Sequence, residues 1–449
     1  MAAPDDAARL DRSRDSRPGS ALPRGVRSGY ALGGVATGAF GTVPGLMLLP
    51  YLTERLAVPA ALAGVIVFAP KAWDVVLNPI AGRISDHSTS PQGPRRPFLL
   101  RAGLTLAVAF ALLFAGPASP RALATGWVAV LFLACATAYA FFQVPYVAMP
   151  AEITDDADER TRLMTWRVAI LSVAILVSGG LAPLIRNQVG PDHGYTVMGV
   201  FVAALIAAGA LGAWWGTRAA PTGAVRAATG SLRSQLALVA ADRDYRALLG
   251  TFVIQALAVG SMLAGVDYVA RQVLHDAGAG SLLFVGFVAP AILFTPLWER
   301  LGRRVGKRRG YTAAALVLAT GALALVFARG LSMPLILLAV AVVGVGYAGA
   351  QLFPLSMLPD VAAADAARTG QNRVGVFTGV WTAGETLGMA LGPGLYGGLL
   401  ALGGYVSSTD ATAAQPGSAI TAIVVGFSAL PAALVLASLL VLRRYRLES

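Results

Sequence analysis

Three polar residues, Lys71, Asp74 and Asn78, interrupt an apolar stretch that reads KAWDVVLNPIAGRISD over residues 71–86. Their spacings of three and four place all three side chains on one face of a helix. A charge at the middle of a membrane-spanning helix costs about 3 kcal/mol on insertion scales. One interpretation is a structural ion pair, in which Lys71 and Asp74 neutralise each other. The other is that Asp74 accepts a proton or helps bind a cation, while Lys71 moves on and off it.

Acidic residues also occur in two later apolar stretches. Glu385 lies in VWTAGETLGMALGP, one helical turn after Trp381. A buried carboxylate holds a proton more readily than an exposed one, so Glu385 is a candidate proton carrier and Trp381 a candidate wall of the same site. Asp267 and Tyr268 lie late in another stretch and are either solute contacts or solvated residues near a loop.

Other polar side chains have the chemistry of a solute site. Arg167 offers the forked donors of a guanidinium to an acidic or polyhydroxylated solute, or it is a charge at a helix end. Gln143, with Tyr139 and Tyr146, forms a polar stripe suited to hydroxyl groups. Glutamine and tyrosine also bond between helices, so both interpretations stay open.

The composition indicates a membrane protein. Of 449 residues, 56% are hydrophobic and 13% are charged, whereas soluble domains are about a quarter charged. Apolar stretches of roughly 20 residues, each able to cross the hydrocarbon core as a helix, recur along the chain. The formal net charge of +12 does not indicate a nucleic-acid binder, because the basic residues lie between these stretches.

Signatures of other protein classes are missing from the sequence. It contains no nucleotide-binding P-loop, no GxSxG motif and no clustered histidines. We therefore expect neither an ATP-driven pump nor an enzyme, and no metal or cofactor. The single cysteine, Cys135, excludes an internal disulfide.

The apolar stretches predict an all-α membrane protein with twelve transmembrane helices. We expect them near residues 28–52, 58–83, 97–117, 124–150, 163–185, 194–217, 247–270, 278–299, 310–328, 332–358, 372–402 and 417–442. Lysine and arginine gather in the N-terminal tail, in the loops after even-numbered helices and at the C-terminus. The loops after odd-numbered helices hold only Arg55, Arg121, Arg186, Arg271 and Arg329. This bias predicts that both termini are cytoplasmic.

A long polar loop divides these helices into two groups of six, and the groups resemble each other. NPIAGRISDHSTSPQGPRRP after the second helix has a counterpart in TPLWERLGRRVGKRRG after the eighth, and the ends of the fourth and tenth helices also match. Such weak repetition is typical of major facilitator transporters. The expected parts are a disordered cytoplasmic tail (1–27), a six-helix bundle (28–217), a cytoplasmic linker (218–246), a second six-helix bundle (247–442) and a C-terminal tail (443–449).

The repeated loops carry charges with two interpretations. They either orient the helices in the membrane, or they bridge neighbouring helix ends and latch one conformation. The residues concerned are Arg83, Asp86, Arg95 and Arg96 after the second helix and Arg300 and Arg303 after the eighth.

At WDVVLNPIAGRISD, followed by GPRRPFLLRAG, the sequence resembles the glycoside–pentoside–hexuronide:cation symporter family of the major facilitator superfamily. The resemblance continues through QVPYVAMPAEIT, ERTRLMTWRVAIL and TGVWTAGETLGMALGP, and so covers nearly the whole chain. It implies that Asp74 stands at the first cation-site carboxylate of that family. Asn78 stands at the second carboxylate position and Ala140 at a hydroxyl position, so oxygen ligands for sodium have been lost.

The resemblance also concerns the sugar site. Arg167 matches an arginine of the family, whereas Gly38 and Gln143 stand at the positions of two sugar-binding carboxylates. Glu385 lies at or beside a position where the family often has lysine. The resemblance therefore implies the fold and the central cavity, but not galactoside recognition.

Together these features predict a secondary transporter that moves a small polar, sugar-like solute across the inner membrane by alternating access. Coupling to protons fits better than coupling to sodium. Two alternatives are a proton-driven exporter of drugs or secondary metabolites and a lysolipid carrier. The expected partners are the solute, a proton or a sodium ion, and the lipid bilayer, with the protein acting as a monomer without nucleic acid.

Overall fold

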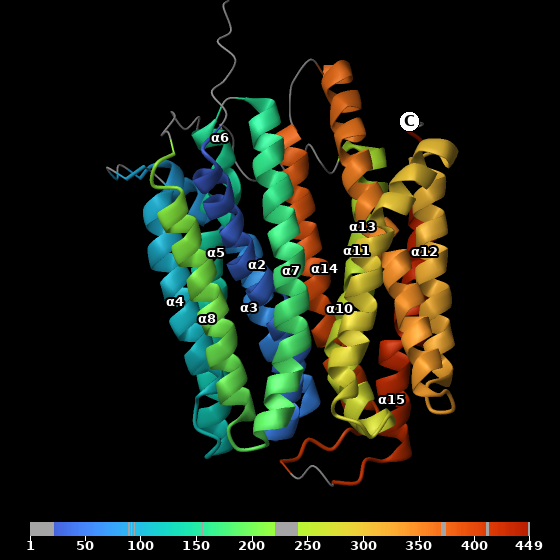
Figure 1. The fold of residues 1–449 in the computed structure, drawn as a ribbon. Coiled ribbons are helices and arrows are strands. Elements are labelled where there is room, and N and C mark those ends of the chain that lie inside the picture. Colours follow the sequence, from blue (N-terminus) through green and yellow to red (C-terminus); the bar gives the residue numbers. More distant parts are fainter. Residues whose placement is uncertain are drawn as a thin grey trace, which may run out of the picture.

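The computed structural model is a bundle of long, roughly parallel helices (Figure 1). It describes residues 22–88, 90, 92–93, 95–154, 156–220, 241–369, 374–409 and 413–447. Most of the expected N-terminal tail, and residues 221–240 of the expected linker, lie outside these ranges.

The helices of the first half follow the expected spans. They are α2 (Arg24–Pro50) continued by η2 (Tyr51–Arg55), α3 (Ala60–Asp86), α4 (Arg96–Phe114), α5 (Arg121–Ala148), the short α6 (Pro150–Ile153), α7 (Ala157–Val189) and α8 (Gly194–Gly216). α2 begins a turn earlier than expected, directly after Pro23. Proline has a fixed φ angle that suits the start of a helix.

The second half contains the remaining spans. They are α10 (Arg243–Tyr268) continued by η3 (Val269–Val273), α11 (Ala279–Val305), α12 (Lys307–Ala324) continued by η4 (Leu325–Phe327), α13 (Met333–Thr369), α14 (Val374–Leu402), α15 (Gly417–Phe427) and α16 (Ala429–Leu442). α10 begins at a cap, since the side chain of Asp242 accepts a hydrogen bond from the Tyr245 backbone N–H at 2.8 Å.

Two expected boundaries differ in the structure. α13 runs to Thr369, about three turns beyond the expected end at 358. The last expected span is divided into α15 and α16 at Ser428, whose φ and ψ of −129° and −75° are not helical. Hydropathy reports neither feature, because the extension is polar and the break lies inside an apolar run.

The apolar character of the helices agrees with a membrane protein. Within the described ranges, eleven stretches are long and apolar enough to cross a membrane. α14, with 29 residues, is long enough as well.

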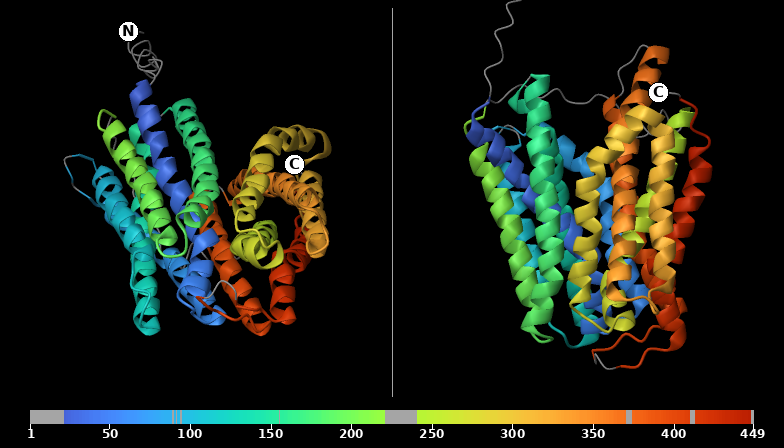
Figure 2. Two further views of the ribbon diagram at one scale, coloured as in Figure 1. Left: turned by 60° about the horizontal axis from the view of Figure 1, so that its bottom comes forward. Right: turned by 45° about the vertical axis from the view of Figure 1, so that its right-hand side comes forward.

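The two halves of the chain lie side by side (Figures 1 and 2). Helices α2 to α8 occupy one side and α10 to α16 the other, and both chain ends emerge at the same end of the bundle. We call this the termini end and the opposite one the far end. The halves meet where α3 packs along α14, α7 against α11 and α2 against α10.

Some helices approach each other very closely. A Cβ atom on Gly29 of α2 would lie only 2.4 Å from the Cα atom of Gly216 in α8. Small residues at such crossings let the backbones of membrane helices touch. This packing holds α2 rigidly, and α2 forms one wall of the space between the halves.

Candidate functional site

The polar face of α3 lies inside the bundle. The side chain of Asp74 is 3% exposed, and its Oδ1 atom is buried without a hydrogen-bond partner. Within the described residues no ion pair joins Asp74 to Lys71. Instead, Lys71 Nζ lies 5.0 Å from the ring centroid of Phe40 and 6.0 Å from that of Tyr139, over the aromatic faces. The expected structural ion pair is therefore not formed in this conformation.

Charges from three helices converge near Tyr139 on α5. Its hydroxyl group lies within the electrostatic reach of Asp74 on α3, Arg167 on α7 and Glu385 on α14. Within the described ranges, Glu385 forms no hydrogen bond or ion pair, and it borders a small void beside Tyr347. Each of these three candidates, far apart in the sequence, therefore acts on the same tyrosine.

Several buried polar atoms in this region have no hydrogen-bond partner. Native proteins rarely leave such atoms unpaired, so each one indicates an absent ligand, an ion or water. The atoms are Asp74 Oδ1, Gln143 Oε1, Arg167 Nε, Gln351 Oε1 and Trp381 Nε1, and they come from five different helices. Both donors and acceptors are present, as recognition of hydroxyl groups requires.

Two of the expected solute contacts serve in packing instead. Tyr146 is fully buried, and its hydroxyl donates to the backbone carbonyl of Tyr30 at 2.8 Å. Trp381 is 1% exposed and stacks on Phe252 of α10 with the ring centroids 4.5 Å apart. Their aromatic faces therefore join α2 to α5 and α10 to α14. The Tyr146 ring also carries the Arg167 guanidinium, whose carbon lies 5.3 Å from the ring centroid.

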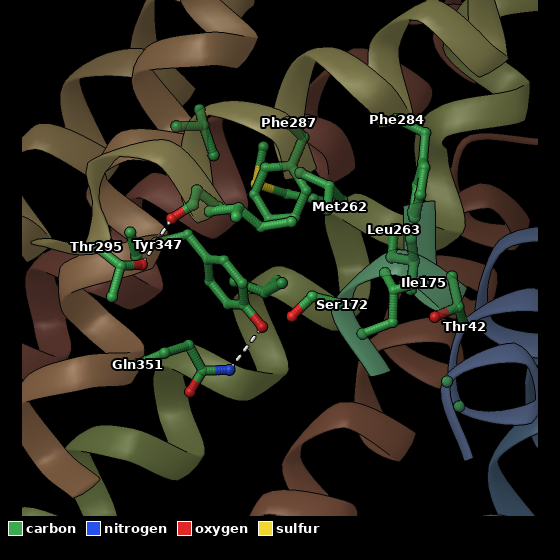
Figure 3. A pocket seen from close by; sticks show the side chains of 18 of the residues that line it. Thr42, Ser172, Ile175, Met262, Leu263, Phe284, Phe287, Thr295, Tyr347 and Gln351 are labelled. Carbon is green, nitrogen blue, oxygen red and sulfur yellow. Dashed lines mark hydrogen bonds between the residues drawn. The ribbon is translucent and has the colours of Figure 1, made fainter. Parts of the chain in front are cut away.

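A cavity of about 780 Å³ lies between the two halves (Figure 3). Its walls come from α2 and α7 on one side and from α10, α11 and α13 on the other. Of the site residues expected from the sequence, Gly38 lines this cavity, and a Cβ atom there would lie 3.0 Å from the backbone oxygen of Leu171, so glycine lets α2 approach α7 closely. The side chain of Asn78 is only partly buried and does not line it.

The sequence interpretation missed a polar pair in this cavity. Gln351 Nε2 donates to the hydroxyl oxygen of Tyr347 at 2.6 Å, one turn apart on α13 (Figure 3). The sequence does contain the pattern that predicts this pair: an aromatic and a polar residue four apart, and so on one helix face, in an otherwise apolar run. Tyr347 and Gln351 also border the void next to Glu385, so they connect it to the cavity.

A buried ionic network joins the two halves near the far end of the bundle. Arg186 of α7 forms a two-pronged ion pair with Asp267 of α10, which is 1% exposed. Arg271 lies 3.2 Å from the same carboxylate and 3.7 Å from that of Glu54 in η2. The contacts of Arg186 with Asp267 and of Arg271 with Glu54 cross from one half to the other. The interpretation of Asp267 as a solvated residue is therefore wrong.

Neutral groups reinforce this network. Tyr268 is fully buried and its hydroxyl lies 2.6 Å from that of Thr53, so the solvated interpretation fails for it too. The hydroxyl of Tyr405, in the loop after α14, donates to Glu54 at 3.3 Å. Burial, together with the carboxylate of Glu54, raises the pKa of Tyr405. Tyr405 therefore keeps its proton and acts as a donor.

Comparison with known proteins identifies the family. The sequence matches the family described as MFS/sugar transport protein over residues 29–449. This chain belongs to that family. The resemblance to glycoside–pentoside–hexuronide:cation symporters inferred from the sequence is thereby confirmed, and the chain is a multi-pass membrane transporter rather than an enzyme.

Relatives of this MFS transporter cover nearly its whole length. A putative glycoside/cation symporter of Escherichia coli is 24% identical over 93% of this chain and 91% of its own. An isoprimeverose transporter of Lactiplantibacillus pentosus is 23% identical over 91% of this chain and 86% of its own. The crystal structure of a D-xylose-proton symporter superposes with a TM-score of 0.69 at 14% identity, covering 93% of this chain and 96% of that one. The structural likeness shows the major facilitator fold.

Two of the expected latch residues bridge helix ends in this MFS transporter. The guanidinium of Arg95 donates to the carbonyl of Ala148 and lies 3.8 Å from the Glu152 carboxylate, which joins the start of α4 to α5 and α6. Arg96 donates to the carbonyl of Ala220, beyond α8, at 2.6 Å. Arg83 is exposed, and the side chain of Asp86 lies outside the described part of the structure.

In the second half, neither of the two expected residues, Arg300 and Arg303, is seen to bridge to a neighbouring helix. Arg303 pairs with Glu299 of its own helix at 3.1 Å, with both side chains exposed, so it does not bridge to a neighbour. No contact of Arg300 with another helix is found among the described residues. Lys307, at the start of α12, makes the bridge instead, with Nζ 2.5 Å from an Asp360 carboxylate oxygen on α13.

Proposed function

We propose that this protein moves a small, sugar-like solute across the membrane by alternating access, coupled to protons. The buried, unpaired polar atoms of Asp74, Gln143, Arg167 and Gln351 carry this proposal. A polyhydroxylated solute would satisfy both the donors and the acceptors among them. Support also comes from the relatives, whose names specify glycosides and isoprimeverose.

Coupling to protons is proposed from the ligand set around Asp74. A sodium site needs several oxygen ligands, and α3 offers one carboxylate here with an amide at position 78. No group of three or more histidine, cysteine and acidic residues suited to an ion is found in the described ranges. A single carboxylate with Lys71 nearby suits the gain and loss of one proton.

The orientation and the internal repeat belong to the same proposal. The distribution of lysine and arginine supports a cytoplasmic termini end, and we propose the inner membrane as the location. Two ion pairs at that end support two equivalent bundles, 28–217 and 247–442: Arg95 with Glu152 in the first and Lys307 with Asp360 in the second. We propose that each bundle moves as a unit within a monomer.

The conformation described here fits one state of the cycle. Polar contacts between the halves gather at the far end, around Arg186, Asp267 and Arg271. We therefore propose that the structure represents a state closed to the outside.

Counterflow of radiolabelled sugars in proteoliposomes tests the function. Pentosides, hexosides and hexuronides are offered in turn, with an imposed pH gradient, with a sodium gradient and with neither. We expect exchange of at least one glycoside, and accumulation driven by the pH gradient. Exchange of no glycoside would refute the substrate class, and accumulation driven by sodium alone would refute proton coupling.

A further inference from the structure

The walls of the 780 Å³ cavity offer little to a hydroxylated solute. Apart from six residues with hydroxyl or amide groups, its lining consists of glycine, proline and hydrocarbon or methionine side chains. Ile175, Met262, Leu263 and Phe287 project into it (Figure 3). A volume of this size lies within the usual range for small-molecule sites, about 300–1,000 Å³.

Most of the polar groups in this lining are already engaged. The hydroxyl of Thr37 donates to the carbonyl of Gly34, that of Ser172 to Val168 and that of Thr295 to Ala291, each within its own helix. A sugar ring placed against these walls would lose its hydrogen bonds to water and find few replacements, which is unfavourable. An apolar group would lose nothing and would gain burial.

Free hydrogen-bonding capacity is concentrated at one edge of the cavity. There Gln351 Oε1 is buried without a partner, and the Tyr347 hydroxyl keeps its own proton available while accepting from Gln351. Both residues also border the small void that Glu385 lines. On α7, which forms the opposite wall, Arg167 lies one turn before the lining residue Leu171, and its guanidinium packs over the Tyr146 ring. We call Tyr347, Gln351 and Glu385 the polar cluster. Its first two members line the apolar cavity, so the cluster and the cavity are neighbours.

We propose that the solute is amphipathic: a glycoside whose sugar binds the polar cluster and whose aryl or alkyl aglycone occupies the apolar cavity. This inference rests on the proposed sugar transport and adds the class of aglycone to it. The aglycone fills the space between α7 and α11, and the sugar meets Gln351, Arg167 and Glu385.

Gly41 of α2 offers a direct way to reduce the cavity. It lines the cavity, and a Cβ atom at this position would meet nothing within 4 Å. A larger side chain at position 41 therefore enters the cavity without striking a neighbouring backbone. Gly126 of α5 is a matched control, since a Cβ there also meets nothing within 4 Å and the residue does not line the cavity.

The test compares p-nitrophenyl and methyl glycosides of the same sugar, for several sugars, in proteoliposomes of the full chain. Inhibition of counterflow gives an affinity for each. In the wild type we expect the p-nitrophenyl member to bind at least tenfold more tightly than the methyl member. Along the series Gly41→Ala, Gly41→Leu and Gly41→Phe this ratio should fall toward one. Gly126→Leu should keep the wild-type ratio.

The outcomes separate this inference from the function on which it rests. If the two glycosides bind the wild type equally well, the aglycone site is refuted while glycoside transport stands. The same holds if a Gly41→Phe protein with normal thermal unfolding keeps the wild-type affinity ratio. If neither the p-nitrophenyl nor the methyl glycoside inhibits counterflow for any sugar, and a fluorescent lysolipid binds the cavity and is displaced by unlabelled lysolipid, then glycoside transport and this inference are refuted together.

Discussion

Asp74 and Lys71 lie three residues apart in the sequence, but their side chains do not form an ion pair in the structure. Asp74 is buried with an unpaired oxygen, while Lys71 rests over two aromatic rings nearby. The two charges are close enough to interact but are not bonded, which leaves the carboxylate free for a proton.

Asp74→Asn removes the proposed proton site with little change in volume. We expect accumulation driven by a pH gradient to fall at least tenfold, because the amide cannot be deprotonated at neutral pH. Exchange of solute without a gradient should continue. Gradient-driven and counterflow uptake in the same proteoliposomes measure both quantities, and undiminished accumulation by the variant would exclude Asp74 as the carrier.

Arg167→Lys keeps the charge but removes the planar fork of donors. Its guanidinium lies over the Tyr146 ring and its Nε atom has no partner. We expect affinity for the glycoside to weaken about tenfold, close to the loss of one charge-assisted hydrogen bond of about 1.5 kcal/mol. Inhibition constants in counterflow measure this. The exposed Arg303→Lys is the control, and equal effects of the two substitutions would contradict a solute contact at Arg167.

Candidate residues could be found from the sequence where a charge stands in an apolar run. Asp74, Arg167 and Glu385 were found in this way, and the fold places all three near Tyr139. The burial of Tyr146 could not be found, because it depends on the rotation of α5 against α2, which composition does not encode. Tyr347 and Gln351 were overlooked because amide and phenol groups change hydropathy little.

At the scale of helices, α7 and α10 carry the buried ion pair that joins the two halves at the far end. Their ion pair was not foreseen, because its partners, Arg186 and Asp267, lie 81 residues apart and near expected loops. Helix positions themselves were largely predictable, since apolar length determines them. The break at Ser428 was not, because a local change of backbone angle leaves the apolar run intact.

Asp267→Asn should favour opening of the far end. It leaves the buried Arg186 without a full countercharge, and breaking a buried pair costs about 3 kcal/mol, or about a hundredfold in the balance between states. We expect a cysteine at position 172 to react faster with an impermeant maleimide added on the far-end side. The exposed pair of Arg303 and Glu299 supplies the control, because Arg303→Ala should leave the rate unchanged. An unaltered rate in Asp267→Asn would refute a closing role for this pair.

At the scale of the whole molecule, the proposed orientation can be tested with the help of Cys135. This single cysteine is fully buried and should give little background labelling. The exposed His193 lies in the loop between α7 and α8 at the far end, and the exposed Arg444 follows α16 at the termini end. We expect an impermeant maleimide to label His193→Cys in intact cells and Arg444→Cys only after permeabilisation. The reverse pattern would overturn the orientation.

The far-end network also bears on how the transporter responds to membrane voltage. Its ionic groups are the guanidiniums of Arg186 and Arg271 and the carboxylates of Asp267 and Glu54, so their charges cancel. Moving one elementary charge through 100 mV is worth about 2.3 kcal/mol. Each half, however, carries one charge of each sign, Arg186 with Glu54 and Arg271 with Asp267, so neither half moves a net charge when they separate. Opening and closing of this end should therefore be electrically silent. Any current that accompanies transport would then arise at the centre of the bundle, where Lys71, Asp74 and Glu385 are not paired with one another.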